Sequence, residues 1–316
     1  MIRTIWLASY PKSGNTWLRM LLASATQNRP LDINDLTATS GIASARGPFD
    51  QLTLIDSGLL THDEVDVLRP RVHEHLVRGM EDGAEERREP AAPVRFVKTH
   101  DAYILTPRGE PLLAGADGAS GAVVIVRDPR DVAPSLAHHV GGGIDEAIVF
   151  MADRRSAFCD RPSRQHSQLR QTLLSWSDHV ASWLDQTDIP VLIVRYEDMI
   201  ADTARTLRQA LGFAGVSVGA LDIARAVEGA RFTALRQQEQ VNGFREAPRR
   251  PAGGAFFRKG QAGAWRDELS ADQVARLEIE HAPAMLRLGY ELTAPDAAAR
   301  RGNSRAPLSR ITETWL

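Results

Sequence analysis

The chain has 316 residues, of which 43% are hydrophobic and 25% are charged. This composition is typical of a globular protein and excludes a collagen-like repeat, a disulfide scaffold and disorder throughout. The 38 basic and 40 acidic residues give a formal net charge of -2, so the chain as a whole is no polycation for nucleic acid, and any anion site must be a local cluster.

No targeting or membrane-spanning segment is predicted. The first apolar run, residues 2–10, is too short for a signal peptide, and no window approaches the roughly 18 apolar residues of a membrane span. The single cysteine, Cys159, cannot form an internal disulfide, which fits a reducing compartment. We interpret it as a small, partly buried hydrophobic residue. We therefore expect a cytoplasmic protein with neither a membrane nor a nucleic-acid partner.

The first predicted unit is a strand, a tight loop and a helix. Residues 2–9 are rich in β-branched and aromatic side chains and stop at Tyr10-Pro11, which predicts a buried strand. The apolar run that opens at Gly14-Asn15-Thr16 predicts a helix with a polar N-terminus. Residues 29–60 are turn-rich, and their pattern favours no element.

Strands and helices then alternate. The predicted buried strands are residues 94–98, 122–126 and 191–194, and the predicted helices are 62–80, a helix that begins at Pro129, 169–184, 202–212, 219–236 and 270–288. Residues 243–263 are predicted to form a loop. Unbroken apolar strands indicate burial on both faces, as in a parallel sheet.

This order of elements predicts the fold class and the place of the site. We expect an α/β fold with a doubly wound, mainly parallel sheet flanked by helices, and a site at the carboxyl ends of the strands. Residues 1–292 are expected to form a single domain, followed by a loosely packed tail, residues 293–316.

The first strand–loop–helix unit has the features of an anion cradle. Its loop reads Tyr10-Pro11-Lys12-Ser13-Gly14-Asn15-Thr16-Trp17. Such a loop presents several backbone N–H groups to one point, and the dipole of the helix adds positive potential. It is not a Walker A loop, because its only glycine follows the lysine. An ordinary strand-to-helix turn with a capping serine is the alternative.

Two further segments combine cations with small residues. In Val126-Arg127-Asp128-Pro129-Arg130-Asp131-Val132-Ala133-Pro134-Ser135, Arg127 and Ser135 could converge on one phosphate. In Phe256-Phe257-Arg258-Lys259-Gly260-Gln261-Ala262-Gly263-Ala264-Trp265, two cations precede a glycine. The alternatives are a surface Arg–Asp pair for the first segment and a solvated basic loop for the second.

Together the three segments resemble the sulfotransferases that use 3′-phosphoadenosine 5′-phosphosulfate (PAPS). That family carries Y-P-K-S-G-T-T-W, R-[DN]-P-x-D-V-x-x-S and R-K-G-x-x-G-x-W in this order. Lys98-Thr99-His100 is similar to its K-x-H, and Tyr196-Glu197-Asp198-Met199 to its Y-E-D-M. Trp176, His179 and Trp183 resemble a further helix motif, and Leu288-Gly289-Tyr290 the C-terminal L-G-Y. The resemblance spans residues 3–290 and implies a P-loop-like phosphosulfate site.

The resemblance also implies roles for individual residues. His100 would be the general base, with Lys12 and Lys98 close to the transferred group. The residues implied to bind PAPS and the product adenosine 3′,5′-bisphosphate (PAP) fall into three groups. They are Lys12, Ser13, Gly14, Asn15, Thr16 and Trp17 around the 5′-phosphosulfate; Arg127, Ser135, Arg258, Lys259 and Gly260 around the 3′-phosphate; and Trp17, Tyr196 and Phe232 around the adenine.

The chain departs from the family pattern in three places. Asn15 replaces a threonine, and Arg231 precedes Phe232 where the family has serine. The family's dimer motif K-x-x-x-T-V-x-x-x-E is replaced by residues such as Arg266 and Ala275, which puts that mode of dimerisation in doubt.

Histidine clusters elsewhere fit ordinary structural roles. His73 and His75 point to different sides of a helix, so a solvated helix face accounts for the His73-Glu74-His75 triplet better than a metal site. His138-His139 either line the acceptor pocket or interact with a helix C-terminus.

We therefore expect a sulfotransferase that moves the sulfuryl group of PAPS to a hydroxyl, or alternatively an amine, of a small molecule such as a natural product, without a metal. The alternatives are a P-loop-type nucleotide kinase, for which no Walker sequence or metal-binding carboxylate is evident, and a non-catalytic nucleotide-binding module. The sequence does not indicate the acceptor.

Overall fold

A four-stranded parallel sheet lies at the centre of the chain. The structure, a computed structural model, describes residues 3–27, 29–36, 39, 41–82, 94–161, 166–247 and 255–293. The strands β1 (Arg3–Ser9), β2 (Val94–Thr99), β3 (Gly121–Val126) and β6 (Val191–Arg195) lie in the order β2-β1-β3-β6. Leu7 in β1 is paired with Lys98 in β2 and with Val123 in β3. Because every pairing is parallel, the carboxyl ends of the four strands lie at one edge of the sheet.

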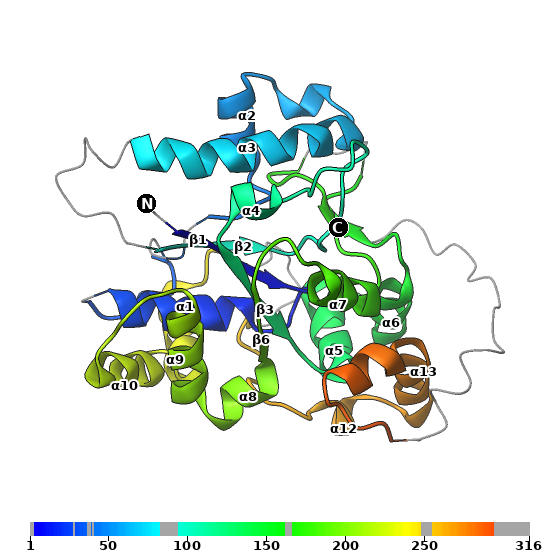
Figure 1. The fold of residues 1–316 in the computed structure, drawn as a ribbon. Helices are drawn as coiled ribbons and strands as arrows, with labels where there is room; N and C mark the ends of the chain where they lie inside the picture. Colours follow the sequence, from blue (N-terminus) through cyan, green and yellow to red (C-terminus); the bar gives the residue numbers. More distant parts are fainter. Residues whose placement is uncertain are drawn as a thin grey trace.

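Helices cover both faces of this sheet (Figure 1). Side chains of β1 alternate, so Ile5 and Leu7 pack on one face against α1 (Asn15–Thr26), α9 (Thr203–Phe213) and α10 (Ala220–Gly229). Trp6 and Ala8 pack on the other face against α5 (Pro129–Val140), α6 (Ile144–Ala152), α7 (Trp176–Asp185) and α13 (Ala271–Arg287). The prediction of a doubly wound α/β fold is confirmed.

The remaining described elements lie outside this sheet and the helices named above. They are α2 (Arg46–Thr53), the 3-10 turn η2 (Ser57–Leu59), α3 (His62–Asp82), α4 (Gly115–Gly118), β4 (Ala157–Phe158), β5 (Gln171–Thr172), α8 (Tyr196–Ala201), α11 (Phe232–Asn242) and α12 (Trp265–Glu268). Helices α2 and α3 share a small cluster of Phe49, Val65 and Val72, so part of the turn-rich region does form a helix. In Figure 1, α2 and α3 lie together on the side of the molecule away from α1 and α10.

Two helix predictions are wrong in extent. The helix predicted for 169–184 begins only at Trp176, because Ser175 caps it by accepting a hydrogen bond from the backbone N–H of Asp178. Just before this cap, Leu174 has a φ of 61°, and Gln171–Thr172 pair with β4 as a short strand. The helix predicted for 219–236 is two helices that are interrupted at residues 230–231.

The interpretation of His73-Glu74-His75 as a solvated helix face is wrong for His73. Its side chain is 3% exposed and meets the ring of Trp6 edge-on, with centroids 5.3 Å apart, whereas His75 is exposed. The expected tail beyond residue 293 and residues 248–254 of the predicted loop lie outside the described residues.

Candidate active site

A cavity of about 850 Å³ opens at the carboxyl edge of the sheet and collects nearly all of the predicted site residues. This volume is within the usual range for a ligand pocket. The predicted residues that line it are Lys12, Gly14, Asn15, Thr16, Trp17, Lys98, His100, Arg127, Ser135, Tyr196, Phe232, Arg258, Lys259 and Gly260. Ser13 is the exception: it is fully buried behind the loop, and its hydroxyl has no partner among the described residues.

The loop between β1 and α1 has a backbone that suits its sequence. Gly14 caps α1 with a φ of 103°, and a Cβ atom there would lie 2.6 Å from the ring of Tyr196, so only glycine fits. Lys12 also has a positive φ, 69°. The side chain of Asn15 donates hydrogen bonds to the carbonyl oxygen of Leu7 (2.8 Å) and the hydroxyl of Ser9 (3.1 Å), so its amide orders the loop from within.

Aromatic rings form a slot at one end of the cavity. The rings of Trp17 and Tyr196 meet edge-on with centroids 5.8 Å apart, and Trp17 Nε1 donates to the carbonyl oxygen of Ala230. Phe232 lies against Gly260, where a Cβ atom would be 2.2 Å from its ring. The guanidinium of Arg127 stacks over Tyr196 at 4.3 Å. Trp17, Tyr196, Phe232 and Arg127 come from four separate segments, and their flat groups give this end of the cavity a surface suited to a flat ring.

Cations surround the rest of the slot. Arg127 donates to the carbonyl oxygens of Lys12 (3.3 Å) and Gln261 (3.0 Å), which ties two of the basic segments together. Burial, reinforced by the charges of Lys98, Arg127 and Arg258, lowers the pKa of Lys12 to about 7. The Lys12 ammonium lies 4.3 Å from the ring centroid of Phe256. The neighbouring positive charges therefore disfavour the protonated form of Lys12.

A carboxylate that the sequence analysis did not identify holds two of these cations. Glu268 pairs with Arg258 (2.5 Å) and with the Lys259 ammonium (2.8 Å). Asp131 in α5 accepts hydrogen bonds from the backbone N–H groups of Gly263 (2.6 Å) and Trp265 (2.9 Å), which docks the basic loop on the helix that carries Ser135. No spacing rule in the sequence connects Glu268 with the cations it holds, because the loop folds back on itself.

His100 lies just beyond the end of β2 and is oriented by β1. Its Nδ1 is 2.7 Å from the carbonyl oxygen of Ser9. Because a carbonyl can only accept, Nδ1 carries the hydrogen and Nε2 keeps its lone pair. Burial and the charge of Lys98 lower the pKa of His100 well below 6.5, so the ring is neutral at pH 7. A neutral imidazole with a free Nε2 is the form that accepts a proton.

Lys98 and its neighbours complete this part of the cavity. Burial lowers the pKa of Lys98 to about 8, and Glu246, 3.9 Å from its ammonium, opposes that shift. Arg19 holds Glu246 through two hydrogen bonds of 2.8 and 2.9 Å.

Of the two histidines at the end of α5, His139 lines the cavity and His138 is exposed. Cys159 is half-buried and also lines the cavity.

A buried ion-pair network supports the segment after His100. The guanidinium of Arg69 in α3 pairs with Asp101 at 2.6 Å, and both side chains are almost fully buried. Asp101 also accepts from the backbone N–H of Thr172, while Trp183 donates to the Asp101 carbonyl oxygen. The network therefore fixes the residue that follows His100. Nothing in the sequence connected Arg69 with this position.

The residues that the structure describes hold neither a metal cluster nor a membrane-spanning helix. No group of three or more His, Cys, Asp or Glu side chains in these residues is arranged to hold a metal ion. Among the described helices, none has the length and apolar character needed to cross a membrane.

Comparison with known proteins identifies the family to which the chain belongs. Residues 3–285 match the family model of the sulfotransferase domain. The chain belongs to the sulfotransferase family. The luciferin sulfotransferase of Photinus pyralis is 25% identical over 282 residues, which cover 87% of this chain and 69% of that protein. Cytosolic sulfotransferase 17 of Arabidopsis thaliana is 24% identical over 283 residues, 86% of this chain and 71% of the relative.

Solved sulfotransferase structures share the fold. A mouse sulfotransferase complexed with PAP superposes with a TM-score of 0.56 at 19% identity, covering 90% of this chain and 84% of that one. Retinol dehydratase in complex with androsterone and inactive cofactor PAP gives a TM-score of 0.53 at 19% identity, with 93% and 83% covered. The expectation of a sulfotransferase is confirmed at the level of the enzyme class, and the kinase and binding-module alternatives are set aside.

Proposed function

We propose that this sulfotransferase transfers the sulfuryl group of PAPS to a hydroxyl, or alternatively an amine, of a small-molecule acceptor and releases PAP. The observation that carries the proposal is one cavity that combines an aromatic slot, a cluster of cations and a neutral, oriented histidine. A nucleotide with several negative charges fits such a cavity because it supplies both a flat ring and the missing counter-charge. The PAP complexes of two proteins with the same fold support this choice.

Each group of residues would bind a different part of PAPS. The adenine would lie among Trp17, Tyr196 and Phe232. The 3′-phosphate would bind Arg127, Ser135, Arg258, Lys259 and Gly260. The 5′-phosphosulfate would bind the loop of residues 12–17, where the buried hydroxyl of Ser13 lacks a partner among the described residues. The fit is favourable because the donor's negative charge would restore the ordinary ionisation of Lys12.

The chemistry assigned to the side chains follows from their positions. PAPS supplies the sulfuryl group, and the acceptor oxygen forms the new bond to sulfur while the bond from sulfur to the 5′-phosphate oxygen breaks. Nε2 of His100 would take the acceptor's proton. Lys12 and Lys98 would stabilise the negative charge that remains on the 5′-phosphate. Glu246 would keep Lys98 charged and in place.

The acceptor would enter on the side of the cavity away from the aromatic slot. The residues on that wall that the donor would not use are Ile42, His139, Phe158, Cys159, His166, Gln168 and Gln171. They combine apolar surface with hydrogen-bonding groups, which suits a small molecule that carries both. One relative is named for luciferin, and an amine sulfotransferase of Oryctolagus cuniculus is also 23% identical over 280 residues. Both oxygen and nitrogen acceptors therefore belong in the first screen, together with natural products.

The test follows PAP formation from labelled PAPS with a panel of phenols, alcohols, amines and peptide natural products, with and without EDTA. We expect acceptor-dependent turnover that EDTA does not abolish, because fixed cations and N–H donors serve where a kinase uses Mg²⁺. Absence of PAPS and PAP binding would contradict the proposal. Activity lost in EDTA and restored by Mg²⁺ would contradict the expected independence from metals.

A further inference from the structure

Two neighbouring glutamines line the active-site cavity. Gln171 in β5 is 4% exposed, and Gln168 lies three residues before it. Nε2 of Gln171 donates a hydrogen bond to Oε1 of Gln168 (2.9 Å). The hydroxyl of Ser44 donates to the same oxygen (3.0 Å). The two side-chain amides therefore form an ordered pair at the cavity wall, which we call the glutamine pair.

The glutamine pair has one donor and one acceptor group to spare. Nε2 of Gln168 donates to none of the described residues, and Oε1 of Gln171 accepts from none. If both amides turned by 180°, their nitrogen and oxygen atoms would exchange roles, and the pair would still present one N–H group and one oxygen. Because buried polar groups are nearly always hydrogen-bonded, this arrangement indicates an occupant that both donates and accepts.

The glutamine pair has a fixed position relative to His100. The residue after Gln171 is Thr172, which donates from its backbone N–H to the Asp101 carboxylate (3.0 Å). The Thr172 carbonyl accepts from the backbone N–H of Ala102 (2.8 Å). β5 is therefore attached directly to the two residues that follow His100. Since His100 and the glutamine pair line one cavity, a single molecule can contact both.

Apolar surface lies beside the glutamine pair. Phe158 in β4 is paired directly with Gln171 across the antiparallel ladder, so the two side chains lie on the same face of that ladder. Phe158 and Ile42 also line the cavity. The occupant of this place therefore combines an apolar body with its hydrogen-bonding end.

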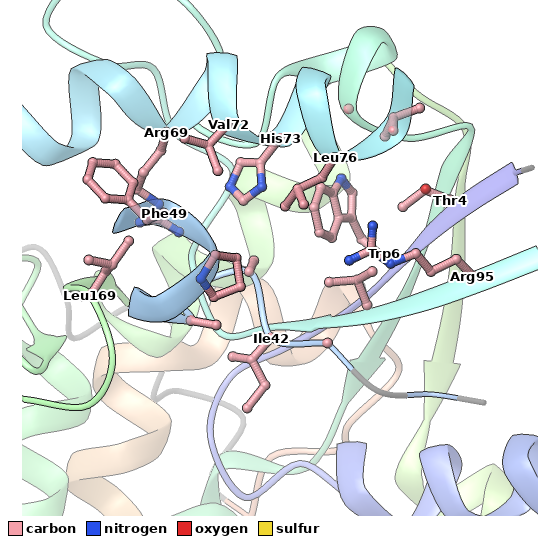
Figure 2. Close-up of a pocket in the computed structure, with 17 residues that line it drawn as sticks. Thr4, Trp6, Ile42, Phe49, Arg69, Val72, His73, Leu76, Arg95 and Leu169 are labelled. Carbon is pink, nitrogen blue, oxygen red and sulfur yellow. The ribbon is translucent and has the colours of Figure 1, made fainter. Parts of the chain in front are cut away.

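The segment that carries the serine of this arrangement is itself fixed to the sheet. Residues 41–45 are tied to β2 by hydrogen bonds from the Ala43 N–H to the Lys98 carbonyl (2.9 Å) and from the Lys98 N–H to the Gly41 carbonyl (3.0 Å). A second cavity, of about 70 Å³, lies between α3 and the sheet (Figure 2), and Ile42 lines both cavities. The wall behind the glutamine pair is thus held by backbone hydrogen bonds.

We propose that the acceptor carries a carboxamide group and that the glutamine pair recognises it. This inference rests on the proposed function, because it concerns the acceptor of the same transfer. With the acceptor's hydroxyl at His100, its carboxamide oxygen would accept from Nε2 of Gln168 and its N–H would donate to Oε1 of Gln171. A carboxylate would place a negative oxygen against the free oxygen of the pair, and an ester would lack the N–H. The part between the hydroxyl and the carboxamide would pack on Ile42 and Phe158.

Matched ligands test this acceptor class. The carboxamides are 4-hydroxybenzamide, 4-hydroxyphenylacetamide and 3-(4-hydroxyphenyl)propanamide, which differ only in the length of the spacer. Each is compared with the corresponding carboxylate, methyl ester and primary alcohol. Calorimetry with the full chain, with and without PAP, measures binding without any need for turnover. We expect at least one carboxamide to bind at least tenfold more tightly than its three analogues, because each analogue leaves a group of the pair unsatisfied or badly matched.

Variants then assign the preference to the glutamine pair. Gln171→Leu should weaken binding of that carboxamide at least tenfold, to the level of its methyl ester. Gln168→Leu, at a half-buried position, should have the same effect and keeps the proposal testable if Gln171→Leu does not fold. Gln209→Leu is the matched control, because Gln209 is exposed on α9 and does not line the cavity.

The outcomes separate this inference from the proposed function. Equal binding of the carboxamides and their analogues, or a preference that survives in both cavity variants, would overturn the acceptor class even where PAP binds normally. Tighter binding of the primary alcohols would overturn it in favour of a hydroxyl at this place. A carboxamide preference that depends on the glutamine pair, in a protein that does not bind PAP, would support the inference and contradict the proposed donor.

Discussion

One carbonyl oxygen determines which ring nitrogen of the expected catalytic base, His100, carries the hydrogen. Ser9 ends β1 beside the end of β2, and its carbonyl accepts from Nδ1 of His100 across the two strands. The hydroxyl of Ser9 lies 3.2 Å from the same nitrogen and is itself held by Asn15. The orientation of His100 thus depends on the loop that is expected to bind the phosphosulfate, which links the base to the donor site.

His100→Ala should lower turnover by roughly 10²–10⁴-fold while the affinity for PAPS stays nearly unchanged, because the variant loses the proton acceptor and keeps the donor site. Steady-state kinetics and calorimetric donor binding measure the two effects. His138→Ala is the control, since His138 is exposed at the end of α5 and should have normal turnover. Normal turnover in His100→Ala would show that another group takes the proton.

Donor affinity should fall as the pH rises above about 7. Lys12 has a pKa of about 7 in the free protein, and the negative donor would raise it, so binding above pH 7 takes up a proton. Below about pH 7 Lys12 is already charged, so it should add no further change in affinity. The decrease is at most about tenfold per pH unit for one proton, and Lys98, with a pKa of about 8, adds to it at higher pH.

Calorimetry in buffers of different ionisation enthalpy measures this uptake directly. Lys12→Arg should flatten the dependence between pH 7 and 8, because a guanidinium stays charged. An affinity that increases with pH would contradict the assignment of Lys12 to the donor site.

At the scale of elements, the proposed nucleotide site is assembled from loops at strand ends. Arg127 follows β3, Tyr196 follows β6, and the basic loop after residue 255 reaches them from the C-terminal part of the chain. In the proposed function each loop would bind one part of the donor, so a single substitution should weaken the binding of one part of the ligand.

Arg127→Ala should weaken PAPS binding at least tenfold, because a charge-assisted hydrogen bond to the 3′-phosphate contributes about 1.5–3 kcal/mol. Adenosine 5′-phosphosulfate lacks that phosphate, so it should bind the unmodified enzyme poorly and lose little further affinity in the variant. Competition binding with both nucleotides measures the difference. Equal losses for the two donors would place Arg127 away from the 3′-phosphate.

Glu268→Gln should strengthen binding of PAP by up to about fivefold. The carboxylate holds Arg258 and Lys259 in the ligand-free protein, so the 3′-phosphate must compete with it for both cations. Partly exposed pairs contribute about 0.2–1 kcal/mol, which sets this limit. Asp267→Asn on the same helix removes a charge without breaking these pairs and is the control. Weaker PAP binding in Glu268→Gln would mean that the carboxylate positions the cations instead.

For the whole molecule, the parallel sheet and its covering helices could be predicted from the sequence. The side-chain interactions between residues that are distant in sequence could not. Apolar runs such as residues 122–126 act locally, and the strands follow from them. The predicted helix 169–184 failed because apolar spacing cannot reveal a left-handed residue, Leu174, that interrupts it. Most of the candidate site was found because its motifs are contiguous, whereas Glu246, Glu268 and Arg69 act through partners that are distant in sequence or in a folded-back loop.

Loss of the ion pair between Arg69 of α3 and Asp101 should lower the free energy of unfolding more than the loss of most other pairs. Arg69→Ala would leave Asp101 buried without its partner, and removal of one partner from a buried pair costs about 3–5 kcal/mol. Urea denaturation measures the change in the free energy of unfolding. Arg71→Ala on the same helix removes a side chain that is 67% exposed and paired with Glu74, and it should change stability by less than about 1 kcal/mol. Similar effects of the two substitutions would contradict the structural importance of Arg69.

Residues 41–45 lie between the cavity at the carboxyl edge of the sheet and a smaller cavity beneath α3. This position matters for any attempt to change the acceptor. Ile42 lines both cavities, and the hydrogen bonds to Lys98 leave this segment little freedom to move away from β2. A smaller residue at position 42 would therefore remove side-chain volume from the walls of both cavities at once. Substitutions at this position would change the space beneath α3 together with the proposed acceptor side.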